Sequence, residues 1–266
     1  MNYSTPNHKQ IVFIGAGNVA THLSKAVKKA GFQTLQVFSR SIDSAQSLAL
    51  QLKCDFTTDI TSVRTDADLY FFAVADDALP AILAVMPPNN GLWIHTAGSV
   101  PMDVFRGYTK RYGVLYPLQT FSKEREKNLS EVSLFIEANA AEDEELLCHL
   151  AGCLSKNVAV MSSEKRKYLH LAAVFACNFS NHLYTLAALI LEKQGIDWRL
   201  LQPILIETVA KYNEMPPEKA QSGPAVRGDR TIIQQHLSML EDEQMRNLYS
   251  LISESINKRC LIKLKQ

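Results

Sequence analysis

One stretch near the start of the chain, residues 11–20 with the sequence IVFIGAGNVA, constrains the fold more than any other. Its first four residues form a short continuous apolar run, which is typical of a parallel strand buried on both faces. Residues 18–30 then carry apolar side chains at helical intervals, and Gly31 stands where helices commonly end. A second predicted strand, residues 34–38, completes a β-α-β unit of about 30 residues. The chain is therefore expected to form an α/β fold with a parallel sheet.

Small residues at the spacing G-x-G-x-x-A join this strand to this helix. Gly15 permits a tight turn, Gly17 lets a pyrophosphate approach the backbone, and Ala20 keeps the helix close to the strand. The helix N-terminus adds unpaired N–H groups and a partial positive charge, which favour phosphate groups. We therefore predict a dinucleotide-binding turn, which contacts its ligand through Gly15, Ala16, Gly17, Asn18 and Val19. The alternative is an ordinary glycine turn in an α/β protein that binds nothing.

The end of the second predicted strand selects the cofactor. Proteins that bind NAD usually place Asp or Glu about 20 residues after the glycines, where it holds the ribose 2′-hydroxyl. This chain has no acid there and instead has Ser39, Arg40 and Ser41. An arginine pairs with a 2′-phosphate, and the two hydroxyls can donate hydrogen bonds to it. The sequence therefore predicts NADP(H) rather than NAD(H), and the alternative is that Arg40 is only a solvated loop residue.

Later strand ends supply the other predicted contacts, because ligands of a doubly wound sheet lie beyond the carboxyl ends of its strands. The predicted strands at residues 69–74 and 92–95 are expected to meet the cofactor through Val74, Ala75, Asp76, Ala97 and Gly98. Ser99 and Gln119 also follow strand ends and are candidates for substrate contacts. Asp76 is equally suited to cap the next helix, and Gln119 to hydrogen-bond with water.

The pattern of the chain changes near residue 160. Before it, predicted strands and helices alternate and give a sheet of about eight strands, the last at residues 158–161. After it, only helical patterns follow, and the first helix spans about 30 residues between Ser163 and Gly195. We predict a doubly wound, mostly parallel sheet in residues 1–160. A smaller all-helical domain follows in residues 161–266, and Pro203 is expected to kink its second helix.

The long predicted helix carries a narrow polar stripe on an otherwise apolar surface. At about 100° per residue, His170, Asn178 and Asn181 lie within about 80° of one another. Buried polar groups need partners, so the stripe either faces a cleft opposite a nicotinamide or forms a structural network between helices. In the first case, His170 is a candidate proton donor or acceptor, because imidazole titrates near neutral pH. Asn178 would orient a substrate carbonyl or carboxylate, and Asn181 would contact the same substrate.

A long loop is predicted at residues 216–228, and its second half reads SGPAVRG. Two glycines and a proline restrict its backbone, while Arg227 and the following Asp229 supply opposite charges. Arg227 is a candidate for holding a substrate carboxylate. Asp229 is a second candidate for substrate contact, and the alternative is that it caps the next helix, residues 230–240.

Composition and charge exclude several classes of partner. The net charge is +1 and no basic tract is present, so neither nucleic acid nor an anionic membrane is an expected partner. Residues 169–191 lack charged side chains, yet histidines and asparagines interrupt them, which favours a helix buried in a core or a dimer interface over a membrane span. Five cysteines without a C-x-x-C pair favour reduced thiols in a cytoplasmic protein, and no metal site is predicted.

Four segments together resemble a known family: GAGNVA, YPLQTF (116–121), SEKRKYLHLAAVFACNFSNHLY (163–184) and SGPAVRGD (222–229). The chain resembles an uncharacterised family with a Rossmann-like NADP-binding domain and a C-terminal helical domain of unknown function. That family lies within the 6-phosphogluconate dehydrogenase and pyrroline-5-carboxylate reductase superfamily. The resemblance implies an NADP-dependent oxidoreductase and a homodimer formed through the helical domains.

The resemblance also implies where the chemistry departs from that of relatives. The β-hydroxyacid dehydrogenases of this superfamily place a Lys and an Asn one turn apart on the long helix. If Asn178 is that Asn, Val174 stands at the Lys position, and His170 is the candidate replacement. We predict hydride transfer to or from a small carbonyl, imine or hydroxy-acid-like substrate. Two alternatives remain: a non-catalytic NADP(H)-binding sensor or scaffold dimer, and a glycine turn that holds another nucleotide such as a flavin.

Overall fold

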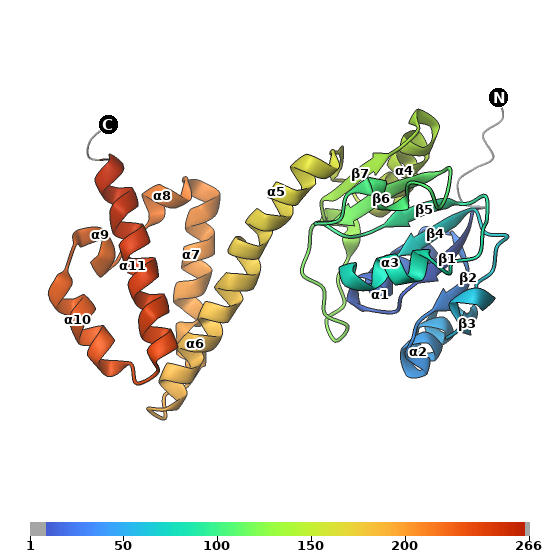
Figure 1. Cartoon of the computed structure of the whole chain (residues 1–266). Helices are drawn as coiled ribbons and strands as arrows, with labels where there is room; N and C mark the ends of the chain where they lie inside the picture. Colours follow the sequence, from blue (N-terminus) through green and yellow to red (C-terminus); the bar gives the residue numbers. More distant parts are fainter. Residues whose placement is uncertain (1–8, 264–266) are drawn as a thin grey trace. The chain divides into compact units, whose positions relative to one another are not determined.

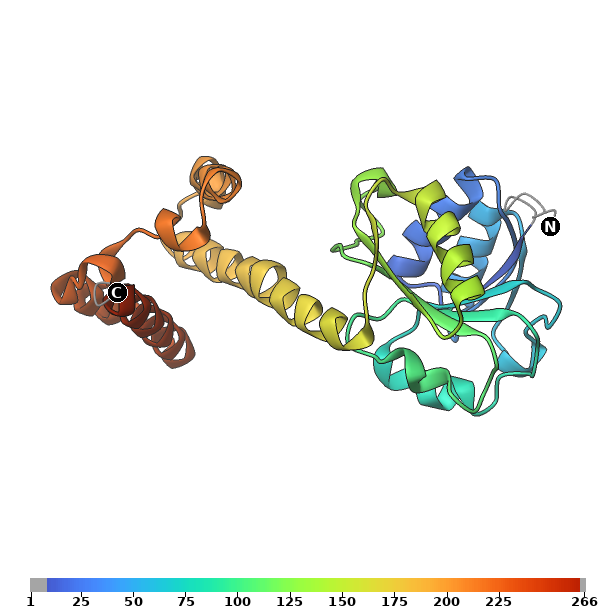
Figure 2. The ribbon, with the colours of Figure 1, turned by 90° about the horizontal axis from the view of Figure 1, so that it is seen from above.

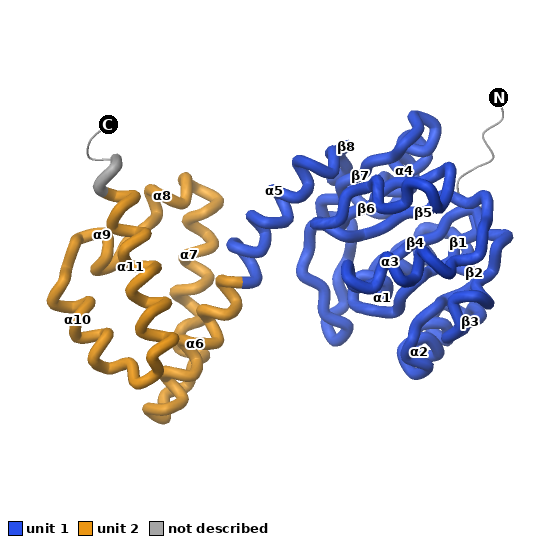
Figure 3. The backbone as a smooth tube through the Cα atoms, in the orientation of Figure 1, with its two compact units in different colours: residues 1–178 blue, residues 179–266 orange. Residues whose placement is uncertain are grey.

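The computed structural model of the chain describes residues 9–263, with side chains up to residue 260. It divides into two compact units, Met1–Asn178 and Phe179–Gln266 (Figure 3). The sheet ends at Val160, beside the predicted domain boundary. The first compact unit nevertheless extends to Asn178, because α5 (Ser163–Ala173) is hydrogen-bonded to the sheet through Arg166.

Within the described residues, the first unit contains one eight-stranded sheet in the order β3-β2-β1-β4-β5-β6-β7-β8 (Figure 1). Neighbouring strands are parallel except β6 and β7, so the predicted mostly parallel, doubly wound sheet is confirmed. The strand order reverses at β1, and this switch point is where open α/β sheets bind ligands. The strands are β1 (Gln10–Ile14), β2 (Gln33–Phe38), β3 (Asp55–Thr57), β4 (Leu69–Phe72), β5 (Leu92–His95), β6 (Tyr112–Pro117), β7 (Leu134–Ala138) and β8 (Val158–Val160).

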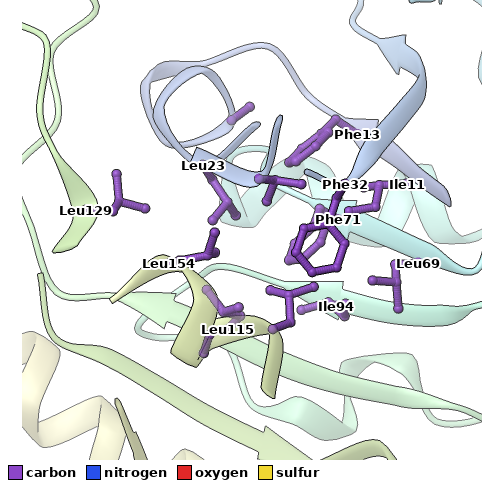
Figure 4. Close-up of a cluster of buried hydrophobic side chains, with 14 of the residues drawn as sticks. Ile11, Phe13, Leu23, Phe32, Leu69, Phe71, Ile94, Leu115, Leu129 and Leu154 are labelled. Carbon is purple, nitrogen blue, oxygen red and sulfur yellow. The ribbon is translucent and has the colours of Figure 1, made fainter. Parts of the chain in front are cut away.

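Helices cover both faces of this sheet, namely α1 (Asn18–Lys29), α2 (Ile42–Leu52), α3 (Leu79–Leu83) and α4 (Ala141–Leu154). Ile11 and Phe13 of β1 belong to one buried cluster, which takes its helical side chains from α1, α2 and α4 (Figure 4). Val12 and Ile14 belong to a second cluster on the opposite face, with side chains of α3. The apolar run of β1 is therefore buried on both faces, as predicted. Each such side chain contributes roughly 1.5–3 kcal/mol through its burial.

The first helix ends where the sequence predicts. Gly31 has a φ of +92°, a backbone conformation that favours glycine, and the N–H of Phe32 donates to the carbonyl of Val27. β2 begins at the next residue, Gln33, and pairs in parallel with β1. The β-α-β unit inferred from the motif is therefore confirmed.

The second unit is helical throughout its described residues and differs from the prediction in two places. Pro203 lies in the first turn of α7, where a missing N–H costs nothing, so it starts this helix instead of kinking it. The predicted loop at residues 216–228 contains two short helices, α8 and α9. The elements are α6 (Ser180–Glu192), a 3₁₀ turn (Trp198–Leu201), α7 (Gln202–Glu214), α8 (Pro217–Ala220), α9 (Pro224–Arg227), α10 (Arg230–Met239) and α11 (Glu243–Lys263).

One uninterrupted helix of 30 residues, Ser163–Glu192, contains α5, a π-helical segment (Val174–Phe179) and α6 (Figure 2). Among the described residues it alone has the length and composition to cross a membrane, and a single such helix is weak evidence for a membrane protein. Several of its large apolar side chains are exposed in the single chain, including Tyr168, Leu171 and Leu183. The predicted burial in a core of the same chain is therefore not what the structure shows, because none of its most apolar window is buried.

Candidate functional site

The turn between β1 and α1 gives its two glycines different roles. Gly15 has a φ of +116°, and a Cβ there would lie 2.3 Å from the carbonyl oxygen of Ala73, so a side chain is excluded. The N–H of Gly15 donates to the carbonyl of Phe38, which ties the turn to the end of β2. A Cβ on Gly17 would meet no atom within 4 Å. Gly15 therefore makes the tight turn possible, and Gly17 leaves open space at the N-terminus of α1.

A cavity of about 270 Å³ lies beside this turn, at the switch point of the sheet. Its walls come from the first glycine turn and from the ends of β2 and β4. It brings together eight of the predicted cofactor contacts: Gly15, Ala16, Gly17, Ser39, Arg40, Ser41, Val74 and Ala75. The other predicted contacts do not line it, namely Asn18, Val19, Asp76, Ala97 and Gly98. The cavity has the location and the lining that a dinucleotide half-site requires.

The end of β2 presents a cation and two hydroxyls to this cavity. Ser41 is the N-cap of α2, and its hydroxyl accepts from the N–H of Ser44 at 3.3 Å. The hydroxyl of Ser39 accepts from the N–H of Ser41 at 3.4 Å, so both hydroxyl protons can donate elsewhere. The Arg40 side chain is exposed and makes no hydrogen bond or ion pair with any other residue that the structure describes. An anion bound here would therefore meet an unneutralised guanidinium.

The ends of β4 and β5 meet through a hydrogen bond between two predicted site residues. The hydroxyl of Ser99 donates a hydrogen bond to the carboxylate of Asp76. Ala75, and not Asp76, is the N-cap of the following 3₁₀ turn (Asp76–Ala78), so the capping alternative for Asp76 is wrong. A second hydrogen bond supports the start of the loop after β5, where the N–H of Ala97 donates to Nδ1 of His95 at 3.2 Å.

His95 is itself buried, with 1% of its surface exposed. Burial, and to a smaller extent the nearby charge of Arg166, lower the pKa of this imidazole to about 3. The ring is therefore neutral at neutral pH, which leaves Nδ1 able to accept the N–H of Ala97.

His170 of α5 lies against the loop after β5 and against β6. Its Nδ1 is 3.0 Å from the hydroxyl oxygen of Tyr116, and the two rings meet edge to face. A Cβ on Gly98 would lie 2.5 Å from the same nitrogen, so the imidazole occupies the space that this glycine leaves. Burial raises the pKa of Tyr116, and the charge of Arg166 partly opposes that rise while Cys177 adds to it. The imidazole of His170 is therefore held by Tyr116 of β6 and by the loop after β5.

A buried ion pair fixes α5 one turn before His170. The Arg166 side chain is fully buried and donates to Glu137 of β7 at 2.8 Å and to the carbonyl of Val100 at 2.6 Å. The hydroxyl of Ser163 donates to the same carboxylate at 2.6 Å and accepts from the N–H of Met102. A buried guanidinium needs partners, and this network engages both terminal nitrogens of Arg166, while its Nε has no hydrogen-bond partner among the described residues.

Sequence reasoning missed Tyr116, Glu137 and Arg166 as parts of this site. A signal for two of them was present, since Glu137 stands in a strand of apolar residues and Arg166 precedes His170 by one helical turn. Nothing in the sequence alone indicated that these two charges meet, because they lie 29 residues apart on different elements. Tyr116 belongs to the segment YPLQTF but carries no spacing signal of its own.

The loop after β6 is attached to the start of α1. The side-chain amide of Asn18 donates to the carbonyl of Phe121 at 2.9 Å, which engages one of its two protons. His22 hydrogen-bonds to the carbonyl of Ser122 and stacks on Phe121. Gln119 is exposed, and its side-chain oxygen accepts from the N–H of Thr120. The predicted substrate contact of Gln119 thus has a local partner in this structure.

The remaining predicted residues lie at or beyond the end of the first unit. Asn178 is exposed and belongs to the π-helical segment, and Asn181 is exposed on α6. Arg227 is exposed at the end of α9. Asp229 is the N-cap of α10 and accepts from the N–H of Ile232 at 3.1 Å, which is the alternative stated for it above.

Within the described part of the chain, no group of three or more His, Cys, Asp or Glu side chains lies close enough together to hold a metal ion. The five cysteines are free thiols. Burial raises the pKa of Cys54 to about 11, so this thiol is unreactive at neutral pH.

Two known families match parts of the chain. Residues 10–93 match the family described as NADP oxidoreductase coenzyme F420-dependent, and residues 132–256 match a domain of unknown function, DUF2520. No curated protein matches the chain.

Solved structures match nearly the whole chain. A pyrroline-5-carboxylate reductase from Streptococcus pyogenes is 14% identical, with a TM-score of 0.63 over 95% of this chain and 99% of that one. An imine reductase from Myxococcus stipitatus in complex with NADP+ is 17% identical, with a TM-score of 0.66 over 96% and 94%. These two share the fold. A putative NADP oxidoreductase from Bacteroides fragilis is 44% identical, with a TM-score of 0.90 over 96% of this chain and all of that one. The chain belongs to the NADP oxidoreductase family of this Bacteroides protein, with an oxidoreductase domain followed by a DUF2520 domain.

Proposed function

We propose that the chain is an NADP(H)-dependent oxidoreductase that reduces or oxidises a small carbonyl, imine or hydroxy-acid-like substrate. The observation that carries the proposal is the cavity of about 270 Å³ at the switch point, lined by eight of the predicted cofactor contacts. Gly17 fits such a ligand because its missing side chain leaves open space at a helix N-terminus. The nicotinamide supplies the hydride chemistry, and the protein supplies binding, orientation and electrostatics.

The 2′-phosphate is assigned to the end of β2. Arg40 has no partner among the described residues, and the hydroxyls of Ser39 and Ser41 retain their protons for donation. A guanidinium with two hydroxyls matches a phosphate dianion in charge and in hydrogen-bonding capacity. The structural neighbour from Myxococcus stipitatus was solved with NADP+, which supports the same class of cofactor.

The proton is assigned to His170, the imidazole held beside the loop after β5. Ser99, whose hydroxyl proton is donated to Asp76, is the second polar group in the loop after β5, and its oxygen would accept a hydrogen bond from a substrate O–H or N–H. Asn178 would orient a carbonyl or carboxylate group. Replacement of His170 by Ala should abolish turnover and leave NADPH affinity nearly unchanged, because His170 does not line the cofactor cavity.

Calorimetric titration with NADPH and with NADH tests the proposal. Tight and selective NADPH binding would support it, and carbonyl, imine and hydroxy-acid substrates would then be screened by the change in NADPH absorbance. Binding of neither nucleotide would overturn it. NADPH binding without turnover on any substrate would instead favour the NADP(H)-binding sensor.

We also propose that two copies associate through the helical unit. Its helices expose large apolar side chains that a soluble monomer rarely presents together, including Leu200, Ile206, Tyr212 and Leu251, each at least 65% exposed. Sedimentation of the purified chain at several concentrations tests this. A monomer at all of them would contradict the proposal, and Ile206→Lys should weaken any dimer found.

A further inference from the structure

His170 is held from two sides by residues that are distant from it in the sequence. Its ring occupies the space above Gly98, where an added Cβ would lie 2.5 Å from Nδ1 and 2.6 Å from Cγ. The hydroxyl oxygen of Tyr116, at the end of β6, lies 3.0 Å from the same Nδ1. Arg166, one turn earlier on α5, is fully buried and fixes the helix to Glu137 of β7. The imidazole therefore has one nitrogen engaged and its position fixed before any ligand binds.

We propose that Tyr116 is a positioning residue that holds neutral His170 in the tautomer with its proton on Nε2. The inference deepens the proposed function, on which it rests, because it specifies how His170 meets the substrate. In this tautomer Nδ1 accepts a hydrogen bond from the hydroxyl of Tyr116. The Nε2–H group is then free to donate a hydrogen bond to a substrate carbonyl oxygen or imine nitrogen. A donor of this kind stabilises negative charge as it develops on that atom.

The direction of the Tyr116–His170 hydrogen bond follows from the partners available. Tyr116 is buried, with 7% of its surface exposed, and the structure gives its hydroxyl no second partner among the described residues. If Nδ1 carried the proton and donated, the hydroxyl proton of Tyr116 would have no acceptor. An unsatisfied buried donor is costly, so the arrangement in which the phenol donates is favoured.

The charges around this pair support the same direction. Burial raises the pKa of Tyr116, so the phenol stays protonated at neutral pH and can be the donor in this hydrogen bond. Arg166 on α5 is paired with Glu137 and offers no acceptor to the phenol. Because Gly98 has no side chain, the ring can approach Tyr116 closely enough for this bond.

Nitrogen NMR of the ligand-free protein tests the inference directly. The chain has seven histidines, and the signals of His170 are assigned by their loss in His170→Gln. When the ring is neutral, we expect an unprotonated Nδ1 and a protonated Nε2. In Tyr116→Phe the same ring should show a mixture of tautomers. The matched control is Tyr168→Phe, because Tyr168 lies on the same helix as His170 but is 71% exposed.

Gly98→Ala provides a second variant with Tyr116 intact. Its methyl group must displace the His170 ring, so the tautomer signals should shift as they do in Tyr116→Phe. A protonated Nδ1 in the wild type, or an unchanged tautomer in Tyr116→Phe, would overturn the inference. These outcomes need no nucleotide, so they are separate from the titration that tests the proposed function.

Kinetics give the functional readout once a substrate is found. Tyr116→Phe should lower kcat by about tenfold, the equivalent of one hydrogen bond, with NADPH affinity unchanged. Tyr168→Phe should leave both unchanged. A wild-type kcat in Tyr116→Phe together with a mixed tautomer would also overturn the role assigned to Tyr116.

Discussion

The proposed cofactor cavity and the surroundings of His170 lie in the same unit, yet they are built in different ways. The cavity takes its key residues from three short continuous segments, each directly after a strand. The imidazole of His170 is held by residues from separate elements, namely Gly98 after β5, Tyr116 of β6, and the Arg166–Glu137 pair that joins α5 to β7. The first site depends on local backbone geometry, whereas the second depends on packing between distant parts of the chain.

Removal of Arg166 should have the largest effect, because it breaks the buried ion pair that joins α5, the helix of His170, to β7. In Arg166→Met, Glu137 keeps its charge, with 17% of its side chain exposed, and loses its partner. We expect the free energy of unfolding in urea to fall by about 3–5 kcal/mol, the usual cost of breaking a buried ion pair from one side.

The matched control for Arg166→Met is the double variant that also carries Glu137→Gln. It removes the unpaired charge, so much of the lost stability should return. A loss below about 1 kcal/mol in the single variant would mean that the pair does not anchor α5.

The two glycines of the turn between β1 and α1 should differ in how much their replacement lowers stability. Gly15→Ala combines a φ of +116° with a clash against Ala73, and we expect unfolding free energy to fall by about 3 kcal/mol. Gly17→Ala should change stability by less than about 1 kcal/mol, because its backbone is extended and its Cβ meets nothing.

Gly17→Ala should instead change nucleotide binding. Gly17→Ala places a methyl group where the pyrophosphate is proposed to lie, so NADPH affinity measured by calorimetry should fall even though the protein stays folded. Unchanged NADPH affinity in Gly17→Ala would remove the turn from the cofactor site. Equal stability of the two variants would contradict the strain assigned to Gly15.

The contrast between the two sites explains what the sequence could predict. The glycine turn, the order of strands and helices, and the segment Ser39–Arg40–Ser41 are encoded in neighbouring residues, so the spacing alone predicted their placement. Tyr116 and Arg166 matter because of what packs against them, and no periodicity reports a contact across 54 or 29 residues. Asp229 shows the same limit within the second unit, since a cap and a ligand contact use the same residue type at the same spacing.

The proposed preference for NADP(H) over NAD(H) rests on Arg40, and replacement of this residue should have a smaller effect. Arg40→Gln should raise the Kd for NADPH by about 30-fold, because a charge-assisted hydrogen bond is worth about 2 kcal/mol. The Kd for NADH should change by less than about threefold, since NADH has no 2′-phosphate. Lys29→Gln, an exposed cation at the far end of α1, is the matched control in calorimetry. Equal losses for both nucleotides would show that Arg40 does not recognise the 2′-phosphate.

The smallest expected effect concerns pH and the loop that carries Gly98. The pKa of His95 is about 3 in the folded chain, lowered mainly by burial, whereas the pKa of a histidine in an unfolded chain is about 6.5. Between these values the unfolded chain binds a proton that the folded chain does not, so stability is present above about pH 6.5 and falls as pH decreases. The unfolding free energy should drop by about 1.4 kcal/mol between about pH 7.5 and pH 5.5 on account of this residue.

Urea titrations of wild type and His95→Gln at both pH values isolate the contribution of His95, because the remaining titrating groups are common to both proteins. An equal pH dependence in the two proteins would show that the imidazole of His95 is not held neutral beneath the loop that carries Gly98.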